Sequence, residues 1–305
     1  MKRTVPNLCL SLIFYLFSFA QMSSAAPKEP AHFHVAAVEL QTSPVPRGFI
    51  PVATEDGSIT YSGDSELHKR LVASHIRLLV IRHGQSQSNA QIGIFLFGRS
   101  ESPLTPLGIE QAHTCGKNLY TELGGDDWAR SCATDANALP VIVSSPLGRA
   151  RDTAETLSQE LLGHLKANVK IEIAIDPRLT ETNFGDLEGH PLADLERDYP
   201  HFLADWRPPA GQGTDFTHRF PGGESRTDVM IRMGSLLDWV TKNCAGRTVV
   251  FVSHSECLLA AQALLGQAPV KEGKLRAATS TIPNATPVWL IGPASTEVSP
   301  APPKN

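Results

Sequence analysis

Residues 76–84 read Ile-Arg-Leu-Leu-Val-Ile-Arg-His-Gly, and this stretch decides the fold. Its apolar part, residues 76–81, has the length of a strand and ends in charged and small residues. Continuous runs of this kind are typical of strands buried on both faces of a parallel sheet. Further runs of strand length follow at residues 141–144, 169–175, 248–253 and 288–291.

Longer amphipathic stretches lie between these runs. One helix face is predicted from the spacing of Val229, Met233, Leu236, Leu237 and Val240. A second is predicted from Ile109, Ala112, Gly116, Leu119 and Leu123, and further helices are expected over residues 150–165 and 257–265. Strands that alternate with helices predict an α/β fold, a three-layer α/β/α sandwich with a mostly parallel central sheet.

The charge balance excludes some partners. The chain of 305 residues carries 27 basic and 31 acidic residues, a formal net charge of −4. No basic tract stands out, so nucleic acid and an anionic membrane surface are poor candidate partners. Any anion that this protein binds must be held by a local cluster of positive groups.

The N-terminus predicts a signal peptide over residues 1–25. Lys2 and Arg3 form a basic start, an apolar run covers residues 8–20, and small residues follow at 23–26. An apolar run this short falls below the roughly 20 residues that span a bilayer. We therefore expect cleavage and export, with no membrane attachment of the mature chain.

Three further segments are expected after the signal peptide. Residues 26–74 contain several prolines and no sustained helical period, which predicts an N-terminal extension, partly extended and partly mobile. The folded domain is expected to cover residues 75–292. The tail, residues 293–305, is rich in Pro, Ser and Ala and is predicted to be disordered.

The mature chain would keep Cys115, Cys132, Cys244 and Cys257, which an exported protein could join in disulfides. A Cys244–Cys257 bridge is excluded, because the strand 248–253 would separate the two by about 20 Å. Any disulfide should draw on Cys115, Cys132 or Cys244, with Cys132 the foremost member.

Charged side chains follow several of the predicted strands. The first strand ends in Arg82 and His83, the second is followed by Arg149, and the fourth by His254. In a parallel α/β sheet the carboxyl ends of the strands meet at one edge, where ligands bind. A cluster of Arg and His on an acidic protein fits a phosphate group. Glu181, after the third strand, would add a carboxyl group that can protonate a leaving oxygen.

Each of these residues also has a simpler interpretation. Each one alone is more often a structural histidine or a surface charge, and only their coincidence at equivalent strand ends favours a site. A metal site could be built from His83, His254 and Glu181. Arg82 and Arg149 would repel a cation there, so no metal is predicted. The predicted chemistry requires no organic cofactor either.

The same residues belong to a series of motifs. The stretch Leu79-Val80-Ile81-Arg82-His83-Gly84-Gln85-Ser86, followed by Asn89, resembles the signature of the histidine phosphatase superfamily, in its phosphoglycerate mutase-like branch. Later blocks resemble that family in order: Ser102-Pro103-Leu104-Thr105, Ser144-Ser145-Pro146-Leu147-Gly148-Arg149-Ala150, Phe184-Gly185 with Glu188-Gly189, Pro221-Gly222-Gly223-Glu224-Ser225, and Val252-Ser253-His254.

The resemblance implies a phosphatase for a small phosphate ester, and the signal peptide implies that it is secreted. It makes His83 the phosphorylated nucleophile and Glu181 the general acid, and it makes Arg82, Arg149 and His254 the ligands of the phosphoryl group. Three further residues are candidate substrate contacts, namely Asn89, Arg99 and Ser255. Chemistry of this kind needs a neutral His83, one of whose ring nitrogens binds a backbone carbonyl, and a protonated His254.

One departure from the family and two rival functions remain. After the second histidine the family usually has small residues, whereas this chain has Ser255 and Glu256. A carboxylate there should weaken anion binding, unless it is protonated or points away.

The rival functions are a phosphoglycerate mutase, which would need a lid such as residues 206–221, and a non-catalytic phospholigand-binding protein. The sequence leaves open the ester and the oligomeric state.

Overall fold

The computed structural model has at its centre a five-stranded sheet in the order β5-β4-β6-β3-β9. Its strands are β3 (Arg77–Arg82), β4 (Val141–Ser144), β5 (Ile173–Ile175), β6 (Thr248–Ser253) and β9 (Pro287–Ile291). The residues that the structure describes are 51–53, 59–61, 65–91, 95–165, 169–200, 218–265, 270–271, 274–275 and 282–293.

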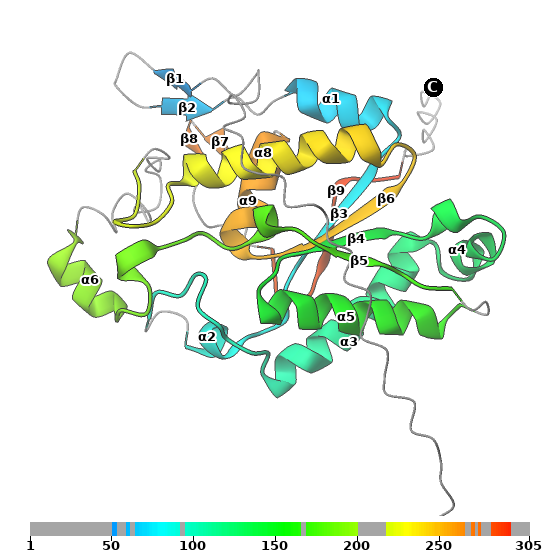
Figure 1. Cartoon of the computed structure of the whole chain (residues 1–305), viewed down its shortest axis with the longest axis horizontal. Helices are drawn as coiled ribbons and strands as arrows, with labels where there is room; N and C mark the ends of the chain where they lie inside the picture. The colour runs from blue at the N-terminus through cyan, green and yellow to red at the C-terminus, as the bar shows by residue number, and fades with distance from the viewer. Residues whose placement is uncertain are drawn as a thin grey trace, which may run out of the picture. The chain divides into compact units, whose positions relative to one another are not determined.

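The sheet is parallel except at one edge. β3 runs parallel to β6, from the pair Arg77 and Thr248 to the pair Arg82 and Ser253. β4 is parallel to both β6 and β5, whereas β9 is antiparallel to β3. The carboxyl ends of β3, β4 and β6 therefore meet at the same edge, and the predicted mostly parallel α/β sheet is confirmed (Figure 1).

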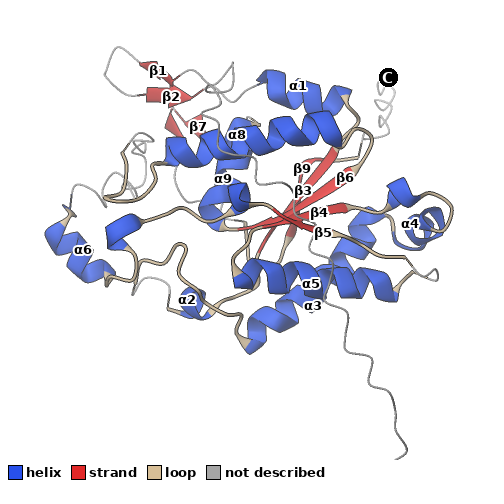
Figure 2. Cartoon of the chain, viewed as in Figure 1, coloured by secondary structure: helices blue, strands red, loops and turns tan. Residues whose placement is uncertain are grey.

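Helices cover both faces of this sheet (Figure 2). One face packs against α1 (Ser65–Ala73), α8 (Arg226–Asn243) and α9 (Ser255–Leu264). The other packs against α3 (Pro106–Leu123), α4 (Gly125–Cys132) and α5 (Gly148–Gly163). Side chains alternate along a strand, so Leu78 and Val80 of β3 join the first core, and Leu79 and Ile81 join the second.

Helix α3 fixes the loop that follows β3. The helix begins at Pro106, and the Thr105 hydroxyl accepts a hydrogen bond from the Gly108 amide at 3.1 Å. A Cβ on Gly108 would lie 2.0 Å from the Gln85 carbonyl oxygen, so only glycine permits this contact. The prediction that Ile109 lies on the buried face is wrong, since its side chain is 47% exposed. The buried stripe instead starts at Gly108, where backbone packs on backbone.

Shorter elements complete the described chain. They are the strands β1 (Pro51–Ala53), β2 (Ile59–Tyr61), β7 (Val270–Lys271) and β8 (Lys274–Leu275), the helices α2 (Gln87–Ala90) and α6 (Leu192–Asp198), and the 3₁₀ helices η1 (Ala136–Ala138), η2 (Pro177–Leu179) and η3 (Gly185–Leu187). β1 pairs with β2, and β7 pairs with β8, both antiparallel.

Some sequence expectations differ from the structure. β5 begins at Ile173 rather than at residue 169. Helix α1 lies inside the segment 26–74, where no helix was expected, and it places Leu67 and Leu71 in the core. The predicted signal peptide, the segment 206–217 of the possible lid and the tail beyond residue 293 lie outside the described residues.

The described cysteines are unpaired in the structure. Cys115, Cys132, Cys244 and Cys257 are all buried free thiols. In the described part of the chain, no helix combines the length and the apolar character that crossing a membrane requires.

Candidate active site

His83 follows β3 directly and is 3% exposed. Its Nδ1 lies 2.7 Å from the carbonyl oxygen of Gly84. A carbonyl only accepts, so Nδ1 carries the ring proton and Nε2 keeps its lone pair. Burial lowers the pKa of His83 well below its ordinary value, and the charges of Arg149 and Arg82 lower it further. The ring is therefore a neutral imidazole whose Nε2 is the unprotonated nitrogen.

Arg149 lies in the first turn of α5 and faces this ring. Its Nε donates to His83 Nε2 at 3.2 Å, and its two terminal nitrogens donate to the carbonyls of Ser100 at 3.1 Å and Gly98 at 2.6 Å. The guanidinium is thus held in place by a loop, residues 98–100. A buried arginine fixed in this way presents charge to a phosphate without reorganisation.

Glu188 holds that loop. Its Oε1 accepts a hydrogen bond from the Gly98 amide at 3.2 Å and another from the Ser100 amide. The same two residues accept hydrogen bonds from Arg149 through their carbonyls. Glu188, far from His83 in the sequence, therefore positions the arginine that contacts His83.

His254 caps the start of α9 and is fully buried. Its Nε2 lies 2.8 Å from the Ser145 hydroxyl, whereas its Nδ1 has no hydrogen-bond partner in the described part of the chain. Its ring centroid lies 5.0 Å from that of His83. Burial lowers the pKa of His254 well below its ordinary value, with Arg149 and His83 adding to the effect. Without a bound anion, the predicted protonated state of His254 is therefore unfavourable.

Arg82, the last residue of β3, completes the positive cluster. Its Nε is buried and finds no hydrogen-bond acceptor among the described residues. Buried donors normally have partners, so this nitrogen and the unpaired Nδ1 of His254 fit an incoming oxyanion. Over the described residues, no group of three His, Cys, Asp or Glu side chains is arranged to hold a metal ion.

Glu181 is the carboxyl group of the cluster and is 8% exposed. Its Oε1 accepts from the Thr182 amide at 2.9 Å, and its Oε2 lies 3.5 Å from the Glu256 amide nitrogen. Burial raises the pKa of Glu181, and the charge of Glu256 raises it further, against the opposing influence of Arg149 and Arg82. The raised pKa that a proton donor needs is therefore present.

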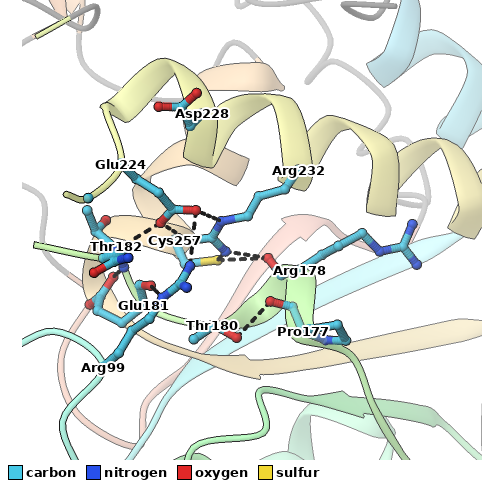
Figure 3. Close-up of polar contacts among 12 residues, drawn as sticks. Arg99, Pro177, Arg178, Thr180, Glu181, Thr182, Glu224, Asp228, Arg232 and Cys257 are labelled. Carbon is cyan, nitrogen blue, oxygen red and sulfur yellow. Dashed lines mark hydrogen bonds and ion pairs between the residues drawn. The ribbon is translucent and has the colours of Figure 1, made fainter. Parts of the chain in front are cut away.

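Glu224 fixes the loop that carries Glu181 (Figure 3). One carboxylate oxygen binds Arg99 at 3.0 Å and Arg232 at 3.1 Å, and the other accepts from the Asn183 amide at 3.0 Å. Arg99 also donates through Nε to the carbonyl of Glu181 at 3.1 Å. Arg232 also donates to the carbonyl of Arg178 at 2.6 Å, so two arginines and one glutamate hold the backbone on both sides of the candidate proton donor.

The three predicted substrate contacts, Asn89, Arg99 and Ser255, form hydrogen bonds or ion pairs within the protein or lie beside a site residue. Asn89 closes the capping box of α2 with Ser86, and its Oδ1 also accepts from Asn284 at 3.2 Å. Arg99 is engaged by Glu224, and Ser255 is the first residue of α9, next to His254. Their contact with substrate stays a prediction.

Sequence reasoning missed three positioning residues. Glu188 and Glu224 lie within the motifs that resemble the histidine phosphatase superfamily, so the sequence did single them out. Their hydrogen bonds were not predicted. Asn284 donates to the His83 carbonyl at 2.7 Å and carried no sequence signal, because it comes from the loop before β9.

Comparison with protein families gives a match over most of the domain. The model of the histidine phosphatase superfamily (branch 1) matches residues 78–284. The chain is 31% identical over 204 residues to the probable phosphoglycerate mutase GpmB of Yersinia pestis (strain Pestoides F), which covers 66% of this chain and 80% of that protein.

Solved structures give similar results. A mycobacterial glucosyl-3-phosphoglycerate phosphatase in complex with VO3 is 29% identical, with a TM-score of 0.52 over 70% of this chain and 91% of that one. The structure called mycobacterial hydrolase 1 is 28% identical, with a TM-score of 0.54 over 70% of this chain and 87% of that one.

Proposed function

This chain belongs to branch 1 of the histidine phosphatase superfamily, and on this premise we propose that it hydrolyses phosphate monoesters through a phosphohistidine at His83. The observation that carries the proposal is the state of the His83 ring. Its Nδ1 is committed to the Gly84 carbonyl, and its Nε2 lies among the cations of Arg149 and Arg82. A neutral nucleophile surrounded by positive charge suits attack on a phosphoryl group.

In the first step, His83 Nε2 forms a bond to phosphorus while the bond from phosphorus to the ester oxygen breaks. Glu181 gives its proton to that oxygen, which leaves as the alcohol, and Glu181 becomes a carboxylate. Arg82, Arg149 and His254 bind the remaining phosphoryl oxygens. The buried nitrogens Arg82 Nε and His254 Nδ1 support this assignment, since they are unpaired among the described residues.

In the second step, water attacks phosphorus and the bond to His83 Nε2 breaks. Glu181 takes the proton from the water, so the products are inorganic phosphate and the starting enzyme. His254 gains a proton only when an anion is bound, because a negative charge within hydrogen-bond reach raises the pKa that burial lowers.

The test is a trapping experiment on the wild-type protein and two variants. Enzyme incubated with a labelled phosphate ester and quenched in alkaline denaturant should carry the label on His83, and His83→Ala should be inactive. Arg149→Ala should lower kcat/KM by roughly 10³-fold, as other arginines that stabilise phosphoryl transfer do. Label on a different residue, or turnover by the alanine variant of His83, would contradict the proposal.

A mutase activity is the second candidate, favoured by the similarity to GpmB. Incubation with 3-phosphoglycerate separates the two functions. A mutase yields 2-phosphoglycerate, whereas a phosphatase yields glycerate and phosphate.

A further inference from the structure

The peptide unit that joins His83 to Gly84 is held at both ends by other parts of the chain. Its carbonyl, on His83, accepts from Asn284 Nδ2 at 2.7 Å, and its amide, on Gly84, donates to the Thr153 hydroxyl at 3.0 Å. Thr153 in turn donates to the carbonyl of Arg149 at 2.7 Å. This peptide unit is therefore fixed between the loop before β9 and helix α5.

The next peptide unit, between Gly84 and Gln85, contacts the imidazole itself. Its carbonyl accepts from His83 Nδ1 at 2.7 Å, and its amide donates to Oε1 of Gln111 at 2.8 Å. Gln111 lies in the second turn of α3. A peptide unit is planar, so its carbonyl and amide ends turn together. Gln111 therefore fixes the direction of the carbonyl that binds the His83 ring.

Close backbone packing leaves this turn little room to adjust. A Cβ on Gly84 would lie 2.3 Å from the carbonyl oxygen of Gly108, and a Cβ on Gly108 would lie 2.0 Å from that of Gln85. An approach this close requires glycine at both positions. The start of α3 and the turn after His83 therefore keep one relative position, in which Gln111 reaches the Gln85 amide.

The hydrogen bond to Gln111 also strengthens the one from His83. Hydrogen bonds in a chain polarise one another, so an acceptor at the amide end of a peptide unit makes its carbonyl a better acceptor. A stronger bond to the Gly84 carbonyl favours the tautomer with its proton on Nδ1. Arg149 donates to Nε2 and favours the same tautomer. When Nε2 attacks phosphorus it gives up that contact, and the Gly84 carbonyl still holds the proton on Nδ1.

We propose that Gln111 is a positioning residue for the nucleophile: through the Gly84–Gln85 peptide unit, it holds the His83 ring in the tautomer and orientation that attack on phosphorus requires. This inference rests on the proposed phosphatase function and adds a residue that acts on the ring through the backbone. Positive charge develops on the ring as the bond to phosphorus forms. The polarised carbonyl, directed at Nδ1 before the reaction, stabilises that charge.

The kinetic test compares Gln111→Met with Gln111→Glu. Methionine has a similar length but lacks the acceptor oxygen, whereas glutamate keeps one. The substrate is nitrophenyl phosphate, whose leaving group needs little protonation, so the measurement reports attack by His83. Gln111→Met should lower kcat/KM roughly 10-fold to 100-fold, as a displacement of a catalytic group by about 1 Å can cause. Gln111→Glu should keep most of the activity.

The inhibition constant of inorganic phosphate should stay at the wild-type value in both variants. Arg82, Arg149 and His254, the proposed ligands of the phosphoryl group, are unaltered by either substitution. A lowered kcat/KM with unchanged phosphate binding would locate the defect in the nucleophile, and it would also show that the variant is folded.

A spectroscopic measurement separates this role from a merely structural one. In ligand-free protein labelled with ¹⁵N-histidine, the His83 signals are those that His83→Gln lacks. The wild type should show a protonated Nδ1 and an unprotonated Nε2. Gln111→Met should show a weaker hydrogen bond at Nδ1, seen as an upfield shift of its proton, and a measurable fraction of the tautomer protonated on Nε2. Gln111→Glu should resemble the wild type.

His113→Met is the matched control. His113 lies on the same helix, and its Nδ1 is 2.6 Å from Oε1 of Glu160 on α5, at the surface. This substitution removes a side-chain contact of α3 without altering the turn after His83. Both kcat/KM and the His83 signals should therefore stay at their wild-type values.

The outcomes separate the two proposals. If Gln111→Met keeps the wild-type kcat/KM, or loses activity while His83 stays protonated on Nδ1 alone, the inference about Gln111 is wrong and the phosphatase function stands. If the wild-type enzyme hydrolyses no phosphate ester, including nitrophenyl phosphate, the proposed function fails. The spectra of the ligand-free protein then still decide whether Gln111 controls the His83 ring.

Discussion

At the scale of single residues, the site contrasts two buried histidines. His83 and His254 both have lowered pKa values in the ligand-free site, but they differ in their hydrogen bonds. His83 has a carbonyl acceptor that fixes its tautomer, whereas His254 has an unpaired Nδ1 in the described part of the chain. The first ring is therefore prepared to stay neutral, and the second to accept a proton together with an anion.

Phosphate binding should be accompanied by proton uptake at His254. At pH 7 the free ring is neutral, since its pKa lies below the usual value of about 6.5, and a bound phosphate should raise that pKa. Calorimetric titration with phosphate in buffers of different ionisation enthalpy measures the protons taken up. The wild-type protein should take up more protons than His254→Gln, and equal uptake by both would contradict the assignment.

Glu181 should set the alkaline limb of the pH profile of kcat/KM. Activity should rise with pH as His83 loses its proton, at a pH below about 6.5, and fall as Glu181 loses its own, above the usual glutamate range. Glu181→Gln should abolish the alkaline limb and lose most activity on an alkyl ester. On nitrophenyl phosphate, whose leaving group needs little protonation, the loss should be smaller.

The control for this experiment is Glu256→Gln. Glu256 pairs with Arg226, so its variant should keep the alkaline limb, moved to lower pH because one cause of the raised pKa of Glu181 is gone. If the dependence on the leaving group appeared in Glu256→Gln instead, the proton donor would be misassigned.

At the scale of elements, the strands were easier to predict than the loops. β4 and β6 begin and end where the apolar runs do, because a strand buried on both faces must be apolar throughout. Helix α1 was missed, because Leu67 and Leu71 are only two core positions in a short, largely polar segment. The residues proposed to bind a phosphate follow strands, so the sequence pattern could locate them. Glu188, Glu224 and Asn284 act through loop geometry, which spacing in the sequence does not encode.

The loop 98–100 should be the sensitive support of Arg149. Glu188→Gln weakens the hydrogen bonds that hold this loop, because a neutral amide accepts less strongly than a carboxylate. We expect a kcat/KM lowered roughly 10-fold to 100-fold, as a 1 Å misplacement of a catalytic group can cause. Glu122→Gln, which alters a contact with Trp289 on the surface, is the control and should leave kcat/KM unchanged. Unchanged kinetics in Glu188→Gln would show that the loop holds Arg149 without this carboxylate.

At the scale of the whole molecule, the active site depends on a core that begins before the predicted domain boundary. Helix α1 packs Leu67 and Leu71 against the face of the sheet that also carries α8 and α9. Helix α8 starts with Arg226, and helix α9 starts directly after His254. Weaker packing of α1 on the sheet should therefore affect the active site, although among the described residues no side chain of α1 contacts a site residue.

Leu71→Ala and Val72→Ala test this dependence. Leu71 is fully buried and Val72 is 48% exposed, although they are neighbours on one helix. Removing the buried side chain should lower the free energy of unfolding by about 2–5 kcal/mol, whereas the exposed one should cost less than about 0.5 kcal/mol. Urea unfolding followed by circular dichroism and by phosphatase activity measures both. If α1 belongs to the same cooperative unit as the site, structure and activity in Leu71→Ala should be lost together, at a lower urea concentration than in the wild type. Loss of the helix signal before the loss of activity would mean that α1 unfolds alone, and that the functional domain begins after it, near residue 75.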